Sequence, residues 1–292
     1  MMAELVAGLI DVFAQTPLSG NPLAVVEDAD GLSDAQMKRI AGEFNQAETT
    51  FLMKSERADW KLRSFTANGT EVFGAGHNAL GAWLWMGEQG HLGPLDTPST
   101  FHQEIGDHVL PITLARVDGR VHGRMRQAEL RLSTPLASPN CLADALGLGS
   151  DDVSQLPVAR VADTGAAHLI ARLRDAQAVD RATPSAEQLL VVLKSVGAEG
   201  CYIYAFDPAA PDTAYTRFFN PTVGLWEDAA TGTAAGPLCA YLGAEGLLNA
   251  NQTLLVEQGV KMGRRSLLHI RLTPNPELSG AGIIVLRGTL TI

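Results

Sequence analysis

An internal duplication is the feature of this chain that most limits how it can fold. When the 292-residue sequence is shifted by 156 positions, EVFGAGHNALG at 71–81 falls on EDAATGTAAGP at 227–237. A strand-like run precedes each segment, and an apolar run that ends in glycine follows it. At a shift near 152, the segment 32–44 falls on 184–196. The sequence therefore predicts two copies of one folding unit.

Each copy predicts the same order of elements: strands, an amphipathic helix, more strands, a glycine-containing loop and an apolar helix. The amphipathic helices have serines at their N-cap positions, Ser33 and Ser185, but no glutamate at the capping-box position. The helices that start near His77 and Thr233 lack a polar face, so we expect strands to wrap around them. The predicted fold class is α+β, with two pseudo-repeated lobes, each a strand barrel around a central apolar helix.

The glycine-containing, charged segment RVDGRVHG at 116–123 is the predicted join between the lobes. We expect residues 1–118 to form an N-terminal lobe that is completed by the closing segment 281–292. Residues 119–280 then form the C-terminal lobe.

Composition excludes several classes of protein. The formal net charge is −10, whereas nucleic-acid binding depends on clustered lysine and arginine, so DNA and RNA are not expected partners. The three cysteines lie far apart without ligand spacing, which predicts no metal site and no disulfide framework. No apolar run approaches the roughly 20 residues needed to span a bilayer, and the amino terminus lacks a basic signal region. We expect a soluble, cytoplasmic protein without membrane partners.

The starts of the two apolar helices predict an anion site that needs no basic side chain. The first turn of a helix has backbone N–H groups without intrahelical partners and carries a partial positive charge. Here these turns begin at Gly76–Asn78 and at Thr231–Thr233. Pro237 is compatible with a helix that starts near Thr233, because we expect it within the first turn. The duplication thus offers two helix starts that could face one cleft and hold a carboxylate.

Three side chains near these helix starts are candidates for catalysis. Asp228 is expected beside the second helix start, with Glu227 pointing elsewhere; alternatively, both acids only cap the helix or complement its dipole. His77 could polarise a substrate or could be a hydrogen-bonded structural residue. Glu48 lies in the strand-like NQAETTFLM, where burial would raise its pKa as a general acid/base requires. The alternative is that Glu48 is solvated at a strand edge.

Taken together, these stretches resemble the phenazine-biosynthesis PhzF-like isomerase family and, more distantly, diaminopimelate epimerase. The resemblance spans nearly the whole chain. The motifs that carry it are LIDVFAQTPLSGNPLAVV from Leu9, ETTF from Glu48, E-V-x-x-x-G-H from Glu71, E-D-x-A-T-G-x-A-A-G from Glu227 and QGVKMGR from Gln258.

The resemblance implies a homodimer with an active site between the lobes and cofactor-free proton transfer on a small carboxylate substrate. Glu48 would shuttle the proton between carbon atoms, while His77 and Asp228 bind and polarise the substrate. No cofactor and no metal are expected. The implied substrate-binding residues are Gly76, Asn78, Thr231, Gly232, Thr233 and Gln258.

The sequence departs from its relatives at several places. Gly74 and Ala230 stand where the epimerases have their two catalytic cysteines, which disfavours racemisation by a thiol pair. Cys239 falls within the second apolar helix and is expected in the core. Ala229 and Arg265 each stand where the family usually has a proline. These changes leave the identity of the substrate undetermined.

Two other functions have some support in the sequence. The segment GAGHNA at 74–79 fits the dinucleotide pattern formally, but no acid ends a strand about 20 residues later, as such a fold requires. The second alternative is a protein of the same fold that has lost catalysis and only binds a small acid or a protein partner. The sequence also leaves open whether the reaction is an isomerisation, such as that of phenazine synthesis, or an epimerisation.

Overall fold

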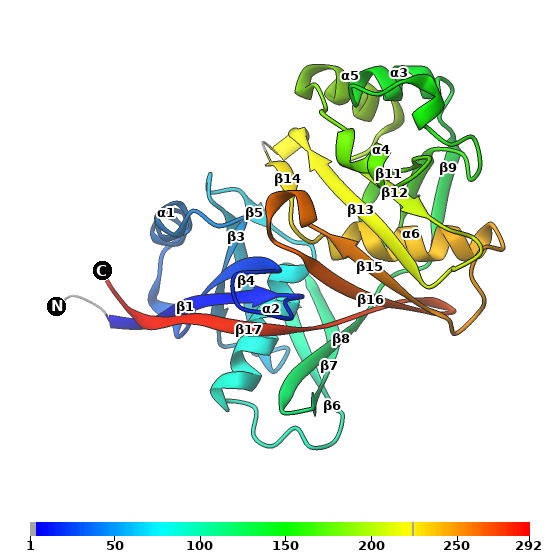
Figure 1. Ribbon diagram of the computed structural model, residues 1–292. Helices are drawn as coiled ribbons and strands as arrows, with labels where there is room; N and C mark the ends of the chain where they lie inside the picture. Colours follow the sequence, from blue (N-terminus) through cyan, green and yellow to red (C-terminus); the bar gives the residue numbers. More distant parts are fainter. Residues whose placement is uncertain (1–3, 224) are drawn as a thin grey trace. The chain divides into compact units, whose positions relative to one another are not determined.

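The computed structural model describes residues 4–223 and 225–292, and the chain divides into two compact units. Unit 1 comprises the chain up to Arg126 together with Ser279–Ile292, and unit 2 comprises Gln127–Leu278. Figure 1 labels the elements of both units. The two units are described separately below.

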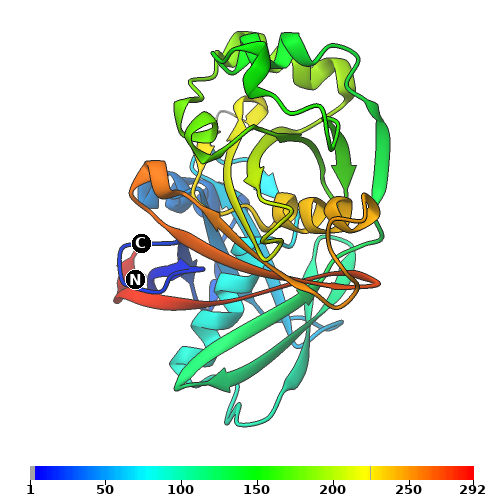
Figure 2. The ribbon, with the colours of Figure 1, turned by 45° about the vertical axis from the view of Figure 1, so that its right-hand side comes forward.

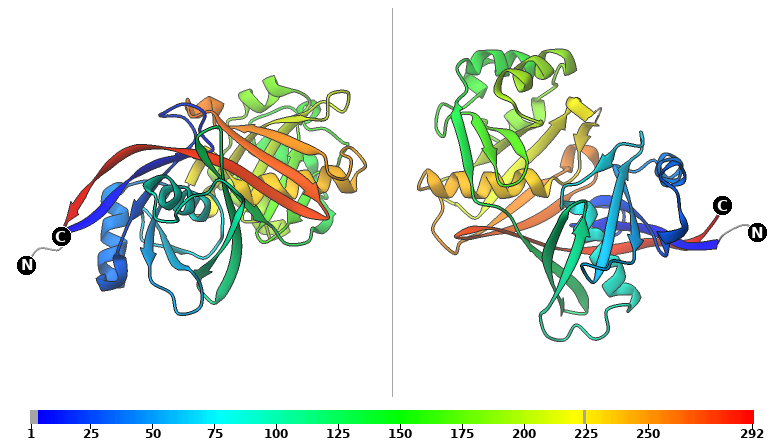
Figure 3. Two further views of the ribbon diagram at one scale, coloured as in Figure 1. Left: turned by 90° about the horizontal axis from the view of Figure 1, so that it is seen from below. Right: turned by 180° about the vertical axis from the view of Figure 1, so that it is seen from behind.

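Unit 1 is a ring of strands around one apolar helix. Its elements are β1 (Glu4–Val12), β2 (Asn21–Val26), α1 (Asp34–Phe44), β3 (Glu48–Met53), β4 (Trp60–Thr66), β5 (Glu71–Val72), α2 (His77–Gln89), β6 (Ser99–Ile105), β7 (His108–Val117), β8 (Arg120–Arg126) and the last part of β17 (Asn275–Thr291). Among the described residues, eight strands close the ring in the order β1, β2, β3, β4, β6, β7, β8 and β17, which returns to β1. Helix α2 packs against strands from most of this ring, and its residues 77–87 are buried. Figure 3 shows β1 and β17 side by side as they lead to the two termini.

Helix α1 covers the outer face of the ring, and the sequence explains both its start and its buried side. Ser33 accepts a hydrogen bond from the backbone N–H of Gln36, whose side chain accepts one from the backbone N–H of Ser33. This is a capping box, so Gln36 completes a motif for which the sequence analysis considered only glutamate. The apolar stripe of α1 packs on the sheet through Met37, Ile40 and Ala41.

Unit 2 repeats this plan. Its elements are β9 (Arg131–Pro135), α3 (Pro139–Ala145), β10 (Arg160–Asp163), β11 (Ala167–Arg172), α4 (Ala176–Arg181), α5 (Ala186–Val196), β12 (Gly200–Phe206), β13 (Thr213–Asn220), β14 (Leu225–Asp228), α6 (Gly232–Ala244), β15 (Thr253–Gln258) and β16 (Ser266–Thr273). The parallel pairs β2–β3 and β4–β6 of unit 1 correspond to β11–β12 and β13–β15. Helix α6 packs against β10, β11 and β16, as Figure 2 shows. The predicted duplication, and a nearly fully buried apolar helix in each copy, are confirmed.

The division between the units differs from the predicted one. The segment 116–123 is not a join, because it forms the hairpin turn between β7 and β8, whose register runs from Thr113↔Arg124 to Val117↔Arg120. The glycine and charged residues that suggested a linker are the residues that a tight turn requires. The observed division follows β8, between Arg126 and Gln127.

Pro237 also lies elsewhere than predicted. Helix α6 begins at Gly232, so the proline falls in the second turn rather than the first. The side-chain amide of Gln127 donates to the Gly232 carbonyl at 2.8 Å, and Gly236 leaves the room that this amide occupies. Cys239 is fully buried in this helix, as expected. No helix in the described residues has the length and apolar character needed to cross a membrane.

Candidate active site

Glu48 and His77 come together in unit 1. Glu48 is the first residue of β3, and His77 is the first residue of α2. The carboxylate Oε2 of Glu48 lies 3.0 Å from Nε2 of His77, and the two side chains are 18% and 8% exposed. Glu48 is therefore neither on the outer surface nor sealed in the core. The pair places a carboxylate and an imidazole at the start of the central helix.

The loop before α2 is held by Asn78. Its Oδ1 accepts from the backbone N–H of Gly76 at 2.9 Å, and its Nδ2 donates to the Gly74 carbonyl and to Ser64 Oγ, both at 3.0 Å. The sequence predicted that Gly76 and Asn78 contact the substrate. In the structure, the Gly76 N–H and the Asn78 amide bond to each other and to neighbouring protein atoms, which shapes the helix start. Their contact with the substrate stays a prediction.

Asp228, Thr231 and Gln258 form the corresponding group in unit 2. Asp228 ends β14, is 7% exposed and accepts a hydrogen bond of 2.6 Å from the hydroxyl of Thr231, the N-cap of α6. The Gln258 amide donates to the backbone carbonyl of Asp228 at 2.7 Å and to the Thr231 hydroxyl oxygen at 3.0 Å. These contacts fix the carboxylate of Asp228 beside the helix start, as the sequence predicted.

Gln258 is buried, and its side-chain amide is bonded within the protein. Its side chain is fully buried, and its Oε1 accepts from the backbone N–H of Thr231 and from the hydroxyl of Tyr202. Both its donors and its acceptor are thus occupied within unit 2. Thr231 is engaged in the same way through its hydroxyl and its N–H. Both residues support Asp228 through these bonds, and their contact with the substrate stays a prediction.

Gly232 and Thr233 open helix α6. A Cβ at residue 232 would lie 2.5 Å from Leu278 Cδ2, so a larger residue there would have to displace the end of the Leu278 side chain. The Thr233 hydroxyl lies 3.2 Å from Nε2 of His168, which sits on β11 and is 2% exposed. Burial lowers the pKa of His168 to about 4, so its imidazole is neutral at physiological pH. The sequence analysis did not identify His168.

An arginine–glutamate pair precedes each central helix, and the sequence analysis missed both. In unit 2, Arg217 binds Glu227 through two hydrogen bonds of 2.8 and 2.9 Å. The guanidinium carbon of Arg217 lies 4.8 Å from the centre of the Phe219 ring. In unit 1, Arg63 binds Glu71 through bonds of 2.7 and 2.8 Å. A signal was present, since the strand before each loop contains an Arg-x-Phe sequence in both copies.

These pairs explain the two adjacent acids that precede α6. Successive side chains of a strand point to opposite sides. Glu227 bonds to Arg217 on one side of β14, and Asp228 bonds to Thr231 on the other. The predicted division of labour between Glu227 and Asp228 is therefore what the contacts show.

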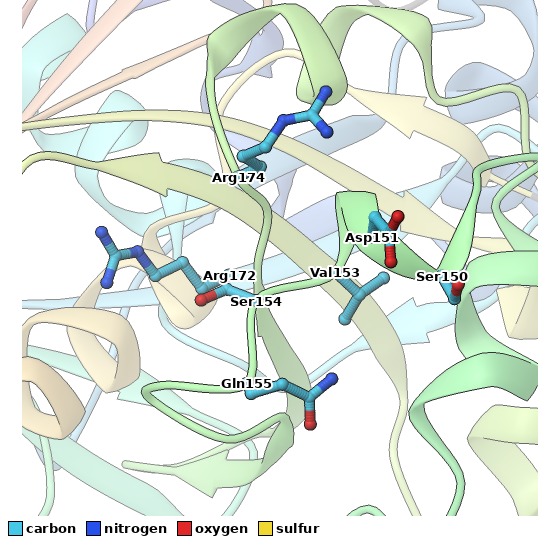
Figure 4. A pocket seen from close by; sticks show the side chains of 7 residues that line it. All are labelled: Ser150, Asp151, Val153, Ser154, Gln155, Arg172 and Arg174. Carbon is cyan, nitrogen blue, oxygen red and sulfur yellow. The ribbon is translucent and has the colours of Figure 1, made fainter.

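A separate surface hollow in unit 2 lacks convergent chemistry. It is lined by Ser150, Asp151, Val153, Ser154, Gln155, Arg172 and Arg174. Figure 4 shows the two guanidinium groups pointing in different directions. Arg172 donates to the carbonyls of Leu156 and Phe206, and Arg174 pairs with Asp152 and Asp175. Within residues 4–223 and 225–292, no group of three or more His, Cys, Asp or Glu residues is placed to hold a metal ion.

Comparison with known proteins adds to these observations. A trans-2,3-dihydro-3-hydroxyanthranilate isomerase of Pseudomonas chlororaphis is 33% identical over 292 residues, which cover 97% of this chain and 98% of that protein. The structure of a PhzF-family phenazine biosynthesis protein from Bacillus anthracis matches with a TM-score of 0.90 at 27% identity, covering 100% of both chains. A predicted epimerase from Pseudomonas aeruginosa matches with a TM-score of 0.84 at 29% identity, covering 98% of this chain and 99% of that one.

The predicted fold class, α+β with two repeated lobes of the diaminopimelate epimerase type, is confirmed by these matches and by the repeated elements. The relatives are named as isomerases or epimerases, which places this chain among enzymes of that class. The profile of the phenazine biosynthesis-like proteins, PhzC-PhzF, matches residues 10–288. The chain belongs to this PhzF-like family of isomerases.

Proposed function

We propose that this enzyme moves a proton between two carbon atoms of a small carboxylate substrate, with Glu48 as the proton carrier and without a cofactor. The observation that supports this role is the Glu48 carboxylate, partly shielded from water and 3.0 Å from the His77 imidazole at the start of α2. A carboxylate in this setting can accept a proton from carbon and return it.

The proposed reaction is balanced without an added reagent. Glu48 takes a proton from a carbon next to a double bond, and the C–H electron pair becomes part of a delocalised anion. The same carboxylic acid then gives its proton to the far end of that system, so the double bond shifts. His77 holds and polarises the substrate beside Glu48, and N–H groups of the helix starts stabilise the negative charge.

Unit 2 contributes binding and orientation in this proposal. Asp228, held by Thr231 and Gln258, accepts a hydrogen bond from the substrate. The start of α6 and the Thr233 hydroxyl hold the substrate carboxylate. We propose that these groups and the Glu48–His77 pair act on the same molecule, and that the active enzyme is a homodimer in the cytoplasm.

The contrast between the two units favours a single base. In unit 1, Leu23 of β2 pairs with Glu48, and in unit 2 the corresponding residue of β11, His168, pairs with Gly200. A Cβ at residue 200 would lie 2.4 Å from Phe218 Cζ, so a side chain there would have to displace the Phe218 ring. Unit 2 thus has no counterpart of Glu48. One carrier that collects and returns the same proton suits a double-bond shift better than a two-base epimerisation.

The name of one relative supports a proposal for the substrate class. The Pseudomonas chlororaphis relative is named for trans-2,3-dihydro-3-hydroxyanthranilate, an unsaturated ring acid. We propose an unsaturated small carboxylate of this kind as the substrate. A protein that binds such an acid without catalysis is the second possibility, because Asp228 and the α6 start would suffice for binding.

Proton exchange in heavy water tests the proposal. The enzyme is incubated in D2O with trans-2,3-dihydro-3-hydroxyanthranilate, and deuterium at carbon and isomer formation are followed by NMR. Glu48→Gln should reduce the rate by at least about 100-fold, since general acid–base catalysis contributes 10²–10⁴-fold. Glu43→Gln, an exposed residue of α1, is the matched control.

Equal rates in the wild type and in Glu48→Gln would remove Glu48 as the carrier. Binding of the acid by the wild type without exchange or isomer formation would favour the binding-only protein. Absence of both binding and reaction would exclude this ring acid as substrate.

A further inference from the structure

His168 has no part in the proton transfer described above, yet it is placed against the start of α6. It lies on β11, is 2% exposed and packs edge-on against Phe218, with ring centroids 5.0 Å apart. Its Nε2 lies 3.2 Å from the hydroxyl oxygen of Thr233, the second residue of the helix. A polar side chain buried this completely needs a hydrogen-bonding reason to be there.

The surroundings of the ring determine which nitrogen carries the hydrogen. Burial keeps the imidazole neutral, because it lowers the pKa of His168 to about 4. In a neutral imidazole one nitrogen donates and the other accepts. Nδ1 is buried without a hydrogen-bond partner in the part of the chain that the structure describes. A buried N–H without an acceptor is rarer than an unused acceptor, so the hydrogen belongs on Nε2, from which it is donated to Thr233.

We propose that His168 is a positioning residue that makes the Thr233 hydroxyl a hydrogen-bond donor to the substrate carboxylate. A hydroxyl that accepts from His168 Nε2–H keeps its own hydrogen for another partner. That hydrogen then suits an anionic acceptor and not a group that must itself donate, such as an ammonium. The inference rests on the proposed function, because it assigns the carboxylate to the start of α6.

Unit 1 indicates which residue can replace His168. Leu23 occupies the matching position on β2, is fully buried and lies beneath α2 next to Gly81. This comparison makes His168→Leu a natural test, since the same fold already accepts leucine there. His168→Gln is the conservative partner, because its side-chain amide can place an N–H close to the original Nε2.

The first measurement needs no ligand and so is independent of the proposed function. Long-range ¹H–¹⁵N correlation spectra of protein labelled with ¹⁵N-histidine are recorded at pH 7.5, with His168→Gln used for assignment. We expect His168 as a neutral Nε2–H tautomer. A neutral Nδ1–H tautomer, or a charged ring, would overturn the proposal whether or not the enzyme binds carboxylates.

The second measurement is the affinity for 3-hydroxyanthranilate, an aromatic counterpart of the ring acid named above. Thr233→Val should weaken binding about 10-fold or more, as loss of a hydrogen bond to a charged group does. His168→Leu should weaken binding about 10-fold, and His168→Gln should weaken it by no more than about threefold. The double variant His168→Leu/Thr233→Val should bind no more weakly than Thr233→Val alone. Circular dichroism and the Tm of each variant show that the fold is retained.

Two results would contradict the positioning role. One is unchanged affinity in His168→Leu beside a clear loss in Thr233→Val. The other is additive losses in the double variant. If the wild type does not bind 3-hydroxyanthranilate, the substrate class proposed above is wrong, and the tautomer measurement still decides the role of His168.

Discussion

The two arginine–glutamate pairs occupy matching places in the two units but differ in burial and in their further partners. In unit 2 the Arg217 and Glu227 side chains are 8% and 11% exposed, and in unit 1 those of Arg63 and Glu71 are 19% and 24% exposed. Arg217 also donates to the carbonyls of Val179 and Ala182 at 3.0 and 2.8 Å. We predict that Arg217→Met destabilises the protein much more than Arg63→Met.

The expected magnitudes follow from what each substitution leaves behind. Arg217→Met leaves the Glu227 carboxylate buried without its cation, which costs about 3–5 kcal/mol of unfolding free energy. Arg63→Met leaves Glu71 and the exposed Asp34, which Arg63 also binds, where water can reach them. About 1 kcal/mol is therefore expected, as for partly exposed ion pairs. Adding Glu227→Gln to Arg217→Met should recover part of the loss, because it removes the unpaired charge.

Urea denaturation followed by circular dichroism measures these differences at pH 7.5. The ranking should be wild type, Arg63→Met, Arg217→Met/Glu227→Gln and then Arg217→Met, in order of falling stability. Equal losses for Arg63→Met and Arg217→Met would refute the reasoning from burial. A double variant less stable than Arg217→Met would show that the buried charge is not the cause.

Two further predictions concern unit 2. Gly200→Ala should lower the free energy of unfolding by about 1–3 kcal/mol, the usual range for overpacking, because its Cβ would lie 2.4 Å from Phe218 Cζ. Thermal denaturation measures the loss, with Gly31→Ala as the control, since a Cβ at residue 31 meets no atom within 4 Å. Equal Tm values for the two variants would contradict the contact with Phe218. The folded pKa of His168 is about 4, against 6.5 for an ordinary histidine, so the unfolded chain binds more protons between these values and stability falls as pH drops through this window. At 1.36 kcal/mol per pKa unit, the loss of unfolding free energy approaches about 3 kcal/mol, and His168→Gln should remove this loss. Urea denaturation across the pH range measures it. The same dependence of stability on pH in the wild type and in His168→Gln would exclude His168 as the cause.

The parts of the fold that the sequence predicted are those that depend on pattern alone. A helix without a polar face must be enclosed, so α2 and α6 could be identified as centres before any contact was known. Their repetition gave the order of elements in both units. The boundary between the units could not be read in this way, because a glycine-containing, charged segment is equally typical of a linker and of the β7–β8 hairpin.

The hydrogen bonds that support the site could not be predicted from the sequence, for a different reason. Tyr202 and Gln258 are 56 residues apart, and only the register of β12, β13 and β15 brings them into contact. Asn78 and Gln258 were chosen because they lie in motifs, which cannot distinguish a residue that contacts substrate from one that holds its neighbour. The structure adds that each amide already has hydrogen-bond partners within the protein, as a supporting residue would have.

A duplicated fold starts with two equivalent helix ends, and the inner strands decide what each end can do. Next to α2 the paired residues are Leu23 and Glu48, so the apolar residue supports the helix and the carboxylate is left to react. Next to α6 they are His168 and Gly200, so the second acid/base position is empty of side chain and the first has become a hydrogen-bond donor. Under the proposed function, these two exchanged positions divide the work between the copies: the unit with Glu48 moves the proton, and the unit with His168 holds the substrate carboxylate. Restoring the symmetry by Gly200→Glu would place a buried carboxylate against the Phe218 ring, so we expect this substitution to destabilise unit 2.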